Sequence, residues 1–234
     1  MTIGDRYRQV LERAAEAAIR AGRRPEEVRV IAAAKTFGVD RLLEAIAAGA
    51  RDLGENYVQE ARRKQDEIRS LGAMEDLRWH MIGRLQRNKA KQALEVFDLI
   101  HSLEGDALAR DLDRAAAAGG RIARCLIEVN LGGEGSKGGT FSDQLGDLLG
   151  RISSYGHLIV EGLMAIPPPG DPRSSRTHFA QLRELRQRLD GLRLPNVQLK
   201  ELSMGMSSNF ETAIEEGATM VRIGTAIFGP RSQE

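Results

Sequence analysis

The sequence predicts a single (β/α)8 TIM barrel, an α/β fold, preceded by one extra N-terminal helix. Short apolar runs alternate with stretches of helical periodicity along all 234 residues. The runs are dense in Val, Ile and Leu, which is typical of parallel strands covered on both faces. Polar residues follow nearly every run, where barrels build their sites. We therefore expect residues 1–234 to form one barrel domain, and an open doubly wound sheet is the alternative.

Eight strands are expected from the apolar runs, and the run over residues 52–57 is the weakest of them. No long linker separates the runs, so the strands are expected to belong to one sheet. The other seven runs cover residues 28–34, 77–82, 97–103, 123–129, 158–166, 197–202 and 220–228.

Helices are expected between the strands, because apolar residues there recur at helical spacing. An extra helix near residues 7–20 precedes the first strand. Gly49 and Gly217 are expected to end two helices, and residues 208–211 (Ser-Asn-Phe-Glu) match a capping box that opens the last one. The apolar stripes are Leu42, Leu43, Ile46 and Ala47; Val58, Ala61, Ile68 and Leu71; Leu108, Leu112 and Ala115; Leu145, Leu148, Leu149 and Ile152; and Phe179, Leu182, Leu185 and Leu189.

The composition indicates a cytoplasmic globular protein. A net charge of +1 gives no global electrostatic argument for binding nucleic acid or an anionic membrane. No run approaches the ~20 apolar residues that span a bilayer, and the N-terminus has no apolar signal-peptide core. The single cysteine, Cys125, lies in an apolar run and is interpreted as a small buried hydrophobe.

Lys35 is the first candidate for chemistry. It ends the most apolar stretch of the N-terminal half, residues 30–35, so we expect it at the barrel mouth. Burial there would lower its pKa from about 10.4 and supply the neutral amine that imine formation requires. The alternative is a lysine that extends from the strand end into solvent, and Lys35 taken alone favours this alternative.

The loops after the seventh and eighth strands are predicted to form a phosphate site. Residues 203–209 leave a strand and enter a helix, where backbone N–H groups and the hydroxyls of Ser207 and Ser208 could bind an anion. Gly224 and Thr225 belong to the eighth strand, and Gly224 allows close backbone approach. Barrels commonly bind phosphate with these two loops. Simple helix capping is the alternative for the serines.

With these residues in view, the chain resembles the pyridoxal phosphate homeostasis proteins, which are related to the N-terminal barrel of alanine racemase. The resemblance covers nearly the whole chain. It implies a pyridoxal phosphate barrel like that of fold type III, which binds and delivers the cofactor without transforming a substrate. The matching segments are residues 34–36, 54–60, 79–89, 100–103, 128–130, 137–138, 162–167 and 202–229.

The resemblance also implies roles for individual residues. Lys35 would form the internal aldimine with pyridoxal 5′-phosphate, Asn56 would lie near the cofactor ring, and Arg222 would face the pyridine nitrogen. Two departures from the family are Asn209, where Asp is common, and Glu161, where a basic residue is common. The phosphate would be held by Ser207, Ser208, Gly224 and Thr225, with Ser208 acting through its backbone N–H.

Arg222 argues against ordinary catalysis. Pyridoxal phosphate stabilises carbanions best when its ring nitrogen is protonated, whereas an arginine only donates hydrogen bonds and keeps that nitrogen unprotonated. Related racemases use a second base from a C-terminal domain and a neighbouring subunit, and this chain stops just after Phe228 and Gly229. We therefore assign no catalytic residue and expect a binding protein.

Several other residues are weaker candidates for a chemical role. His80 and His101 are interpreted as structural polar residues near the barrel mouth, because no third metal ligand has suitable spacing. Glu55 either orients a site residue or pairs with a nearby base. Residues 133–138 match G-x-G-x-x-G, but the next helix begins too late for dinucleotide binding, so a βα loop is preferred. Lys137 in that loop could contact a second or departing cofactor molecule.

The sequence thus predicts a cytoplasmic monomer that holds pyridoxal 5′-phosphate on Lys35 and delivers it, with apoenzymes that require this cofactor as possible partners. No metal, nucleic acid or membrane is expected. The basic run Arg84, Arg87, Lys89 and Lys91 lacks interleaved aromatic residues and is interpreted as a solvated face or a local anion-steering patch. The alternative functions are an amino-acid racemase or lyase on the same barrel and, third, a dinucleotide-dependent oxidoreductase.

Overall fold

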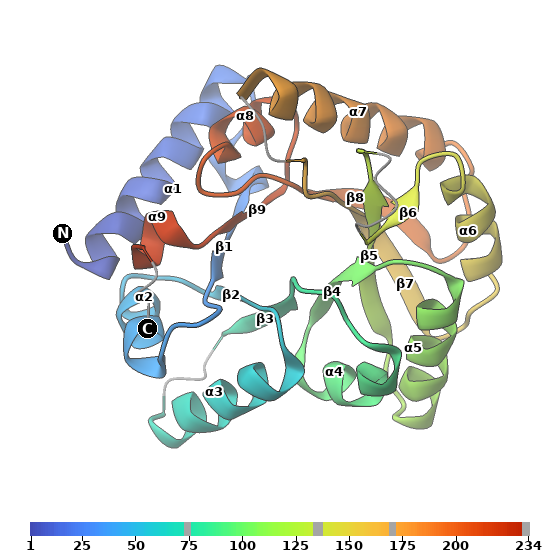
Figure 1. The fold of residues 1–234 in the computed structure, drawn as a ribbon, viewed down its shortest axis with the longest axis horizontal. Helices are drawn as coiled ribbons and strands as arrows, with labels where there is room; N and C mark the ends of the chain where they lie inside the picture. The colour runs from blue at the N-terminus through green and yellow to red at the C-terminus, as the bar shows by residue number, and fades with distance from the viewer. Residues whose placement is uncertain (73–75, 133–137, 169–171, 231–234) are drawn as a thin grey trace.

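The computed structural model describes residues 1–72, 76–132, 138–168 and 172–230. Within these ranges, eight parallel strands occupy the centre and helices surround them (Figure 1). This arrangement confirms the predicted barrel. The strands are β1 (Arg29–Ala33), β2 (Asp52–Glu55), β3 (Arg78–Met81), β4 (Leu99–Leu103), β5 (Ala123–Asn130), β7 (Leu158–Met164), β8 (Val197–Ser203) and β9 (Met220–Ile223).

The barrel closes because each of these strands pairs in parallel with the next along the chain, and β9 returns to β1. Val30 of β1 pairs with Val221 of β9, and Ala32 pairs with Leu53 of β2. A short strand that was not predicted, β6 (Thr140–Phe141), pairs with the end of β5 in a separate sheet. Because all the barrel strands run in one direction, their carboxyl ends meet at one rim.

The helices form an outer ring around the strands (Figure 1). They pack against the sheet through the apolar stripes that define them, as parallel barrels require. Within the described ranges they are α1 (Ile3–Arg20), α2 (Val39–Ala47), α3 (Val58–Ser70), α4 (Ala90–Val96), α5 (Asp106–Ala118), α6 (Leu145–Ile152), α7 (Pro172–Asp190), α8 (Phe210–Glu215) and α9 (Thr225–Phe228), with 3-10 turns at Pro25–Glu27 and Arg87–Lys89.

The extra N-terminal helix, α1, is present and begins at a capping box. The Thr2 hydroxyl accepts a hydrogen bond from the Asp5 N–H, and the Asp5 carboxylate accepts one from the Thr2 N–H. One face of the helix is buried against α2, α8 and α9. This helix therefore covers the barrel where its first and last strands meet (Figure 1). The buried face carries Ile3, Tyr7, Val10, Ala14, Ala17 and Ala18.

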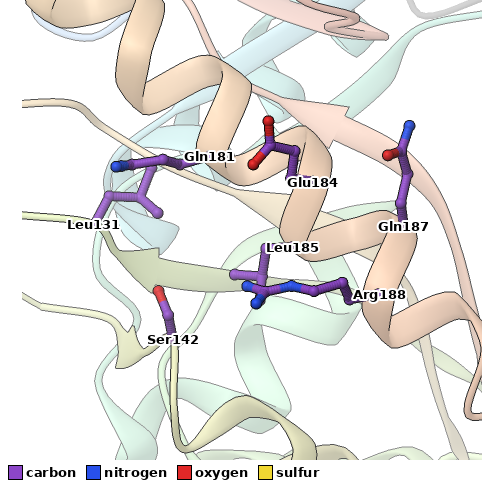
Figure 2. A pocket seen from close by; sticks show the side chains of 7 residues that line it. All are labelled: Leu131, Ser142, Gln181, Glu184, Leu185, Gln187 and Arg188. Carbon is purple, nitrogen blue, oxygen red and sulfur yellow. The ribbon is translucent and has the colours of Figure 1, made fainter.

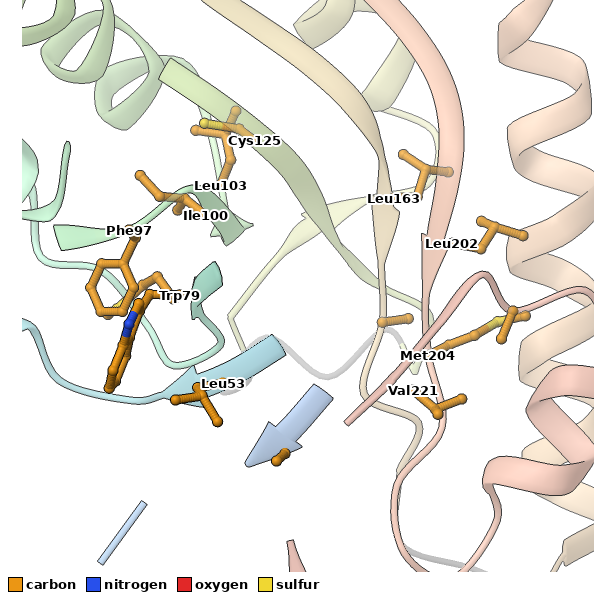
Figure 3. Close-up of a cluster of buried hydrophobic side chains, with 14 of the residues drawn as sticks. Leu53, Trp79, Phe97, Ile100, Leu103, Cys125, Leu163, Leu202, Met204 and Val221 are labelled. Atoms are coloured by element: carbon orange, nitrogen blue, oxygen red, sulfur yellow. The ribbon is translucent and has the colours of Figure 1, made fainter. Parts of the chain in front are cut away.

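Two clusters of buried apolar side chains lie on opposite faces of the sheet. The larger fills the layer between strands and helices and includes Trp79, Ile100 and Leu202 (Figure 3). The smaller has one residue from each of five strands, and chain neighbours of these residues belong to the larger cluster. Because side chains alternate across a strand, the smaller cluster lies inside the barrel. It consists of Ile31, Leu99, Leu126, Met164 and Met220.

The structure corrects two details near the C-terminus. The strand predicted over residues 220–228 ends at Ile223, because the backbone turns at Gly224 and the N–H groups of Ile227 and Phe228 donate to the Gly224 carbonyl. The capping box predicted over residues 208–211 was wrong. The Asn209 side chain accepts from the Met206 N–H at 2.8 Å and closes the preceding loop instead. The predicted helix ends at Gly49 and Gly217 are confirmed, since both adopt positive φ.

Cys125 is fully buried, and burial raises the pKa of its thiol, which confirms that it serves as a small core residue. In the part of the chain that the structure describes, no helix combines the length and apolarity needed to cross a bilayer.

We predict that Gly162 of β7 tolerates no larger residue. A Cβ atom there would lie 1.9 Å from the carbonyl oxygen of Glu201 on the neighbouring strand. Gly162→Ala should therefore lower the free energy of unfolding by about 3 kcal/mol or more. The control, Gly150→Ala in α6, meets no atom within 4 Å and should raise that free energy by up to about 1 kcal/mol. Urea unfolding measures both, and equal stabilities would contradict the prediction.

Candidate functional site

A cavity of about 490 Å³ opens at the carboxyl ends of the barrel strands. Its volume falls in the range of roughly 300–1,000 Å³ that is usual for small-molecule sites. The residues predicted from the sequence come from the ends of β1, β2, β8 and β9, and closure of the barrel brings them together. All seven line this cavity: Lys35, Asn56, Ser207, Ser208, Arg222, Gly224 and Thr225.

Lys35 is half-buried and lies in the turn that follows β1. The next residue, Thr36, has a φ of 69°, a left-handed conformation that costs a non-glycine residue roughly 1 kcal/mol. Two side chains hold the backbone on both sides of Lys35. Lys64 Nζ donates to the Ala34 carbonyl at 2.9 Å, and Glu60 accepts from the Thr36 N–H at 3.3 Å. The position of Lys35 is thus set by contacts beneath the turn.

The cluster beneath the turn is centred on Lys64, a fully buried lysine of α3. Besides the backbone carbonyl, its ammonium group donates to Glu55 at 2.6 Å and to Glu60 at 2.7 Å. Three acceptors match its three N–H donors, as a buried ammonium requires. Lys64 was not among the residues predicted from the sequence. The signal was its position on the apolar stripe between Ala61 and Ile68, where helical spacing predicts burial.

Glu55 of β2 completes this cluster. Its side chain is fully buried, and burial raises the pKa of its carboxyl group to about 7 although Lys64 opposes the shift. The Oε1 atom pairs with Lys64, while Oε2 has no hydrogen-bond partner among the described residues. The pairing with a nearby base, one of the two interpretations of Glu55, is therefore present.

Asn56 follows Glu55 and is half-buried at the cavity wall. The backbone of Gly83, which follows β3, packs directly against it. A Cβ atom on Gly83 would lie 2.6 Å from the Asn56 carbonyl oxygen and 2.7 Å from its Cα atom. No residue larger than glycine fits there without moving Asn56, so Gly83 helps to set the edge of the cavity.

The loops after β8 and β9 are joined at the cavity. The Ser207 hydroxyl accepts a hydrogen bond from the Ala226 N–H at 3.2 Å. Gly224 is half-buried, whereas Ser208 and Thr225 are exposed to the cavity mouth. A Cβ atom on Gly224 would meet only ordinary contacts with Ala33, so packing within the protein does not demand glycine there. The two loops present hydroxyl groups and backbone to one side of the cavity.

Arg222 of β9 lines the cavity from inside the barrel and is only 5% exposed. One guanidinium nitrogen donates to the Ser203 carbonyl at 2.8 Å and to its hydroxyl at 2.6 Å, and the other donates to the Ala165 carbonyl at 3.0 Å. Burial lowers the pKa of Arg222 to about 10, while Glu128 opposes the shift. The group therefore carries a positive charge at neutral pH and donates hydrogen bonds only.

Glu128 of β5 is a cavity residue that the sequence analysis did not single out, although it lies in a matching segment. Burial and the nearby charge of Glu104 raise the pKa of its carboxyl group, while Arg222 opposes the shift. Glu128 also lines an adjoining hollow of about 590 Å³, which shares Gly138, Ile166, Met206 and Ser208 with the cavity. The cavity thus continues into a second compartment beside Glu128.

Other candidates lie elsewhere. His80 and His101 were predicted to lie near the barrel mouth. They lie inside the barrel instead, because alternation along β3 and β4 turns their side chains inward. Glu161 pairs with Arg124 beside a hollow formed at the amino ends of the strands. Lys137 and most of the glycine-rich loop lie outside the described residues. Among those that are described, no group of His, Cys, Asp and Glu is arranged to hold a metal ion.

A further hollow of about 700 Å³ lies beside α7, away from the predicted residues (Figure 2). Most of its lining consists of exposed polar side chains, including Gln181, Glu184, Gln187 and Arg188. None of the seven candidate residues lines it. We therefore assign the site to the cavity at the strand ends, where polar groups converge on a half-buried lysine.

Comparisons with known proteins show the family to which the chain belongs. The family model of the alanine racemase N-terminal domain matches residues 9–232. The chain is 43% identical over 232 residues to the pyridoxal phosphate homeostasis protein of Aquifex aeolicus, covering 99% of each chain. It is 42% identical over 231 residues to the protein of the same name from Pseudomonas aeruginosa, covering 98% of this chain and 96% of that one.

Solved structures give the same picture. The structure of PipY from Synechococcus elongatus with PLP bound has a TM-score of 0.82 and 40% identity, and the match covers 94% of this chain and 100% of that one. Alanine racemase from Corynebacterium glutamicum has a TM-score of 0.67 at 16% identity, covering 97% of this chain and 62% of that one. This second likeness shows a shared fold.

We predict that Lys64 is essential for stability. Lys64→Met would leave the Glu55 carboxyl group buried without its partner, so the free energy of unfolding should fall by about 3–5 kcal/mol. Replacing both partners, as Lys64→Met with Glu55→Leu, should restore much of this loss because no polar group is stranded. Urea unfolding measures the effect, and a double variant no more stable than the single one would refute this account.

Proposed function

Since the chain belongs to the family of the alanine racemase N-terminal domain, and within it to the pyridoxal phosphate homeostasis proteins, we propose that it binds pyridoxal 5′-phosphate (PLP) as an imine on Lys35 and serves intracellular PLP homeostasis and delivery. The single observation that carries the proposal is the convergence of the seven candidate residues on one cavity. The similar structure of PipY, which has PLP bound, supports the choice of ligand.

The residues present fit this ligand. PLP carries an aldehyde that forms a reversible imine with a primary amine, and Lys35 supplies that amine at the cavity wall. Hydrogen-bond donors are available for the phosphate group, because Ser207, Ser208 and Thr225 offer hydroxyl and backbone N–H groups beside Gly224. Arg222 supplies a donor for the ring nitrogen. The site thus offers a group for each polar end of the ligand.

Arg222 also favours holding over turnover. Its guanidinium group stays protonated and donates only, so a ring nitrogen facing it accepts a hydrogen bond and remains unprotonated. An unprotonated ring is the weaker acceptor of electrons from a substrate carbanion. The relatives are named as homeostasis proteins, which agrees with this reasoning. We therefore propose a carrier in preference to a racemase or lyase.

The proposal extends to the partners of the protein. A reversible imine masks the aldehyde and can be exchanged with another amine, so PLP-requiring apoenzymes, which receive the cofactor, are the proposed recipients. We propose that delivery takes place in the cytoplasm from a monomer. Mixing the PLP-loaded protein with such an apoenzyme, with a small-molecule trap for free PLP present, would distinguish direct transfer from release into solution.

The covalent attachment can be tested directly. PLP added to the purified protein should produce the visible absorbance of a lysine imine, and borohydride reduction followed by peptide mapping should place the label on Lys35. Lys35→Ala should lose both signals, whereas Lys91→Ala, at an exposed lysine of α4, should keep them. A colourless protein, or a label on another lysine, would overturn the proposal. Exchange of α-deuterium in amino acids well above the rate with free PLP would favour the racemase alternative.

The phosphate site can be tested through Ser207. We expect Ser207→Ala to weaken PLP binding about tenfold, because a hydroxyl hydrogen bond to a charged phosphate contributes roughly 1.5 kcal/mol. Pyridoxal, which lacks the phosphate, should bind the variant and the parent protein equally. Fluorescence or absorbance titration with both ligands measures the ratio. If the two ligands lost affinity alike, Ser207 would not act through the phosphate.

A further inference from the structure

A continuous line of buried polar side chains crosses the inside of the barrel. Arg222 donates to the Ser203 hydroxyl at 2.6 Å, and that hydroxyl lies 2.9 Å from His101 Nδ1. His101 Nε2 lies 3.0 Å from His80 Nδ1, and His80 Nε2 lies 2.9 Å from Asp52. We call these five residues the cross-barrel chain. They come from β9, β8, β4, β3 and β2, and each is at most 5% exposed.

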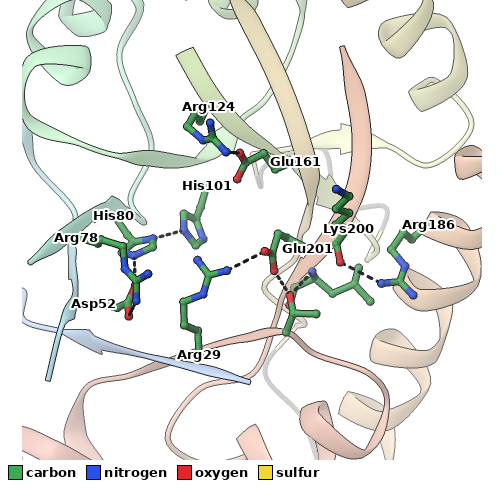
Figure 4. A network of polar contacts seen from close by, with 12 residues as sticks. Arg29, Asp52, Arg78, His80, His101, Arg124, Glu161, Arg186, Lys200 and Glu201 are labelled. Atoms are coloured by element: carbon green, nitrogen blue, oxygen red, sulfur yellow. Dashed lines mark hydrogen bonds and ion pairs between the residues drawn. The ribbon is translucent and has the colours of Figure 1, made fainter. Parts of the chain in front are cut away.

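The cross-barrel chain links two ends of the barrel. Arg222 lines the candidate cofactor cavity at the carboxyl ends of the strands. His80 lines a hollow of about 480 Å³ at the amino ends, where Arg78 pairs with Asp52 at 2.7 Å. Figure 4 shows His80 joined on one side to His101 and on the other to Asp52. His101, His80 and Asp52 do not line the cofactor cavity, and their hydrogen bonds link them to it through Ser203 and Arg222.

The direction of the hydrogen bonds follows from the Asp52 end. Burial raises the pKa of Asp52, but the hydrogen bonds from His80 and Arg78 outweigh it and leave the pKa below its usual value. Asp52 is therefore a carboxylate that only accepts, and His80 Nε2 must carry a proton. His80 Nδ1 faces His101 Nε2, so it accepts a hydrogen bond when His101 carries its proton on that nitrogen.

The Arg222 end leads to the same direction. Arginine only donates, so the Ser203 hydroxyl accepts from Arg222, and its own proton needs an acceptor because the side chain is fully buried. Among the described contacts of this hydroxyl, His101 Nδ1 is the atom that can accept it. Burial lowers the pKa of His101 well below its usual value, so the ring is neutral and its proton lies on Nε2. Every hydrogen bond thus points from Arg222 toward Asp52.

We propose that Ser203, His101, His80 and Asp52 are positioning residues for Arg222, holding its guanidinium group toward the ring nitrogen of the ligand and aligning hydrogen-bond dipoles between it and a distant carboxylate. The physical reason is that neighbouring hydrogen bonds polarise one another in a buried, low-dielectric environment. Neutral histidines of fixed tautomer keep all of these donors and acceptors satisfied. The inference rests on the proposed function, because it takes PLP as the ligand that Arg222 faces.

Nitrogen-15 NMR of the histidine rings tests the direction of the chain in the ligand-free protein. The chain contains 4 histidines, and substituting His157 and His178 leaves the signals of His80 and His101. Both rings should be neutral at pH 7.5 with the proton on Nε2. A proton on Nδ1 of either ring, or a charged ring, would overturn the assigned direction. This measurement requires neither PLP nor a substitution among the five residues of the cross-barrel chain.

Ligand titration tests the positioning role. The probes are PLP and its analogue in which C–H replaces the ring nitrogen. Ser203→Ala should weaken PLP binding by about tenfold while leaving the analogue unchanged, because the lost contact acts through the ring nitrogen. Asp52→Asn, at the far end of the chain, should produce the same selectivity at about threefold. The control is Tyr155→Phe, which removes a half-buried hydroxyl that donates to Asp106 at 2.6 Å, and neither of these residues lines the cavity.

The outcomes separate the two proposals. Selective loss of PLP affinity in Ser203→Ala and Asp52→Asn, with none in Tyr155→Phe, supports the positioning role. Equal loss for both probes, or no loss, shows that the cross-barrel chain serves stability alone and overturns it. If the parent protein binds neither probe, the proposed function fails instead, while the NMR measurement still decides the direction of the chain.

Discussion

Buried positive charge is the constraint on which this barrel depends. Lys64, between strands and helices, and Arg222, inside the barrel, are both nearly removed from water. A buried cation is stable only when acceptors surround it. Lys64 is surrounded by Glu55, Glu60 and a backbone carbonyl, and Arg222 donates to Ser203 and to a second carbonyl. Because these acceptors come from different elements, each cation also joins parts of the rim.

The two cations act on the site from opposite sides of the barrel wall. Lys64 holds the turn of Lys35 from the helix layer, whereas Arg222 enters the cavity from the interior. The proposed ligand would therefore contact the amine of Lys35, on a turn held by Lys64, and the guanidinium group of Arg222, which is held by its own hydrogen bonds. A site with both partners fixed suits reversible holding of an aldehyde, because little ordering remains to oppose binding. The donor-only chemistry of Arg222 then limits what a bound ring can do.

Sequence patterns predicted the barrel and the meeting of the candidate residues at one end of it, and they failed at groups whose surroundings depend on packing. Lys35 and Gly224 stand beside strand ends, so the shared direction of parallel strands placed them at one rim. Lys64 was missed because a lysine on a helix is usually solvated, although its place on the apolar stripe indicated burial. His80 and His101 were assigned to the mouth because a sequence shows that a residue belongs to a strand but not how deep it lies.

The sequence by itself determined the order of elements and favoured a closed barrel with the candidate residues at one rim, because local periodicity and strand direction are properties of the chain. Only the tertiary structure decided which polar groups meet. The contacts of Lys64 with Glu55, and of Ser203 with His101 and Arg222, join residues from separate elements. The hydrogen bonds of the strand residues depend on strand register and on inward or outward alternation, and a shift of one residue along a strand would turn its side chains to the other face of the sheet.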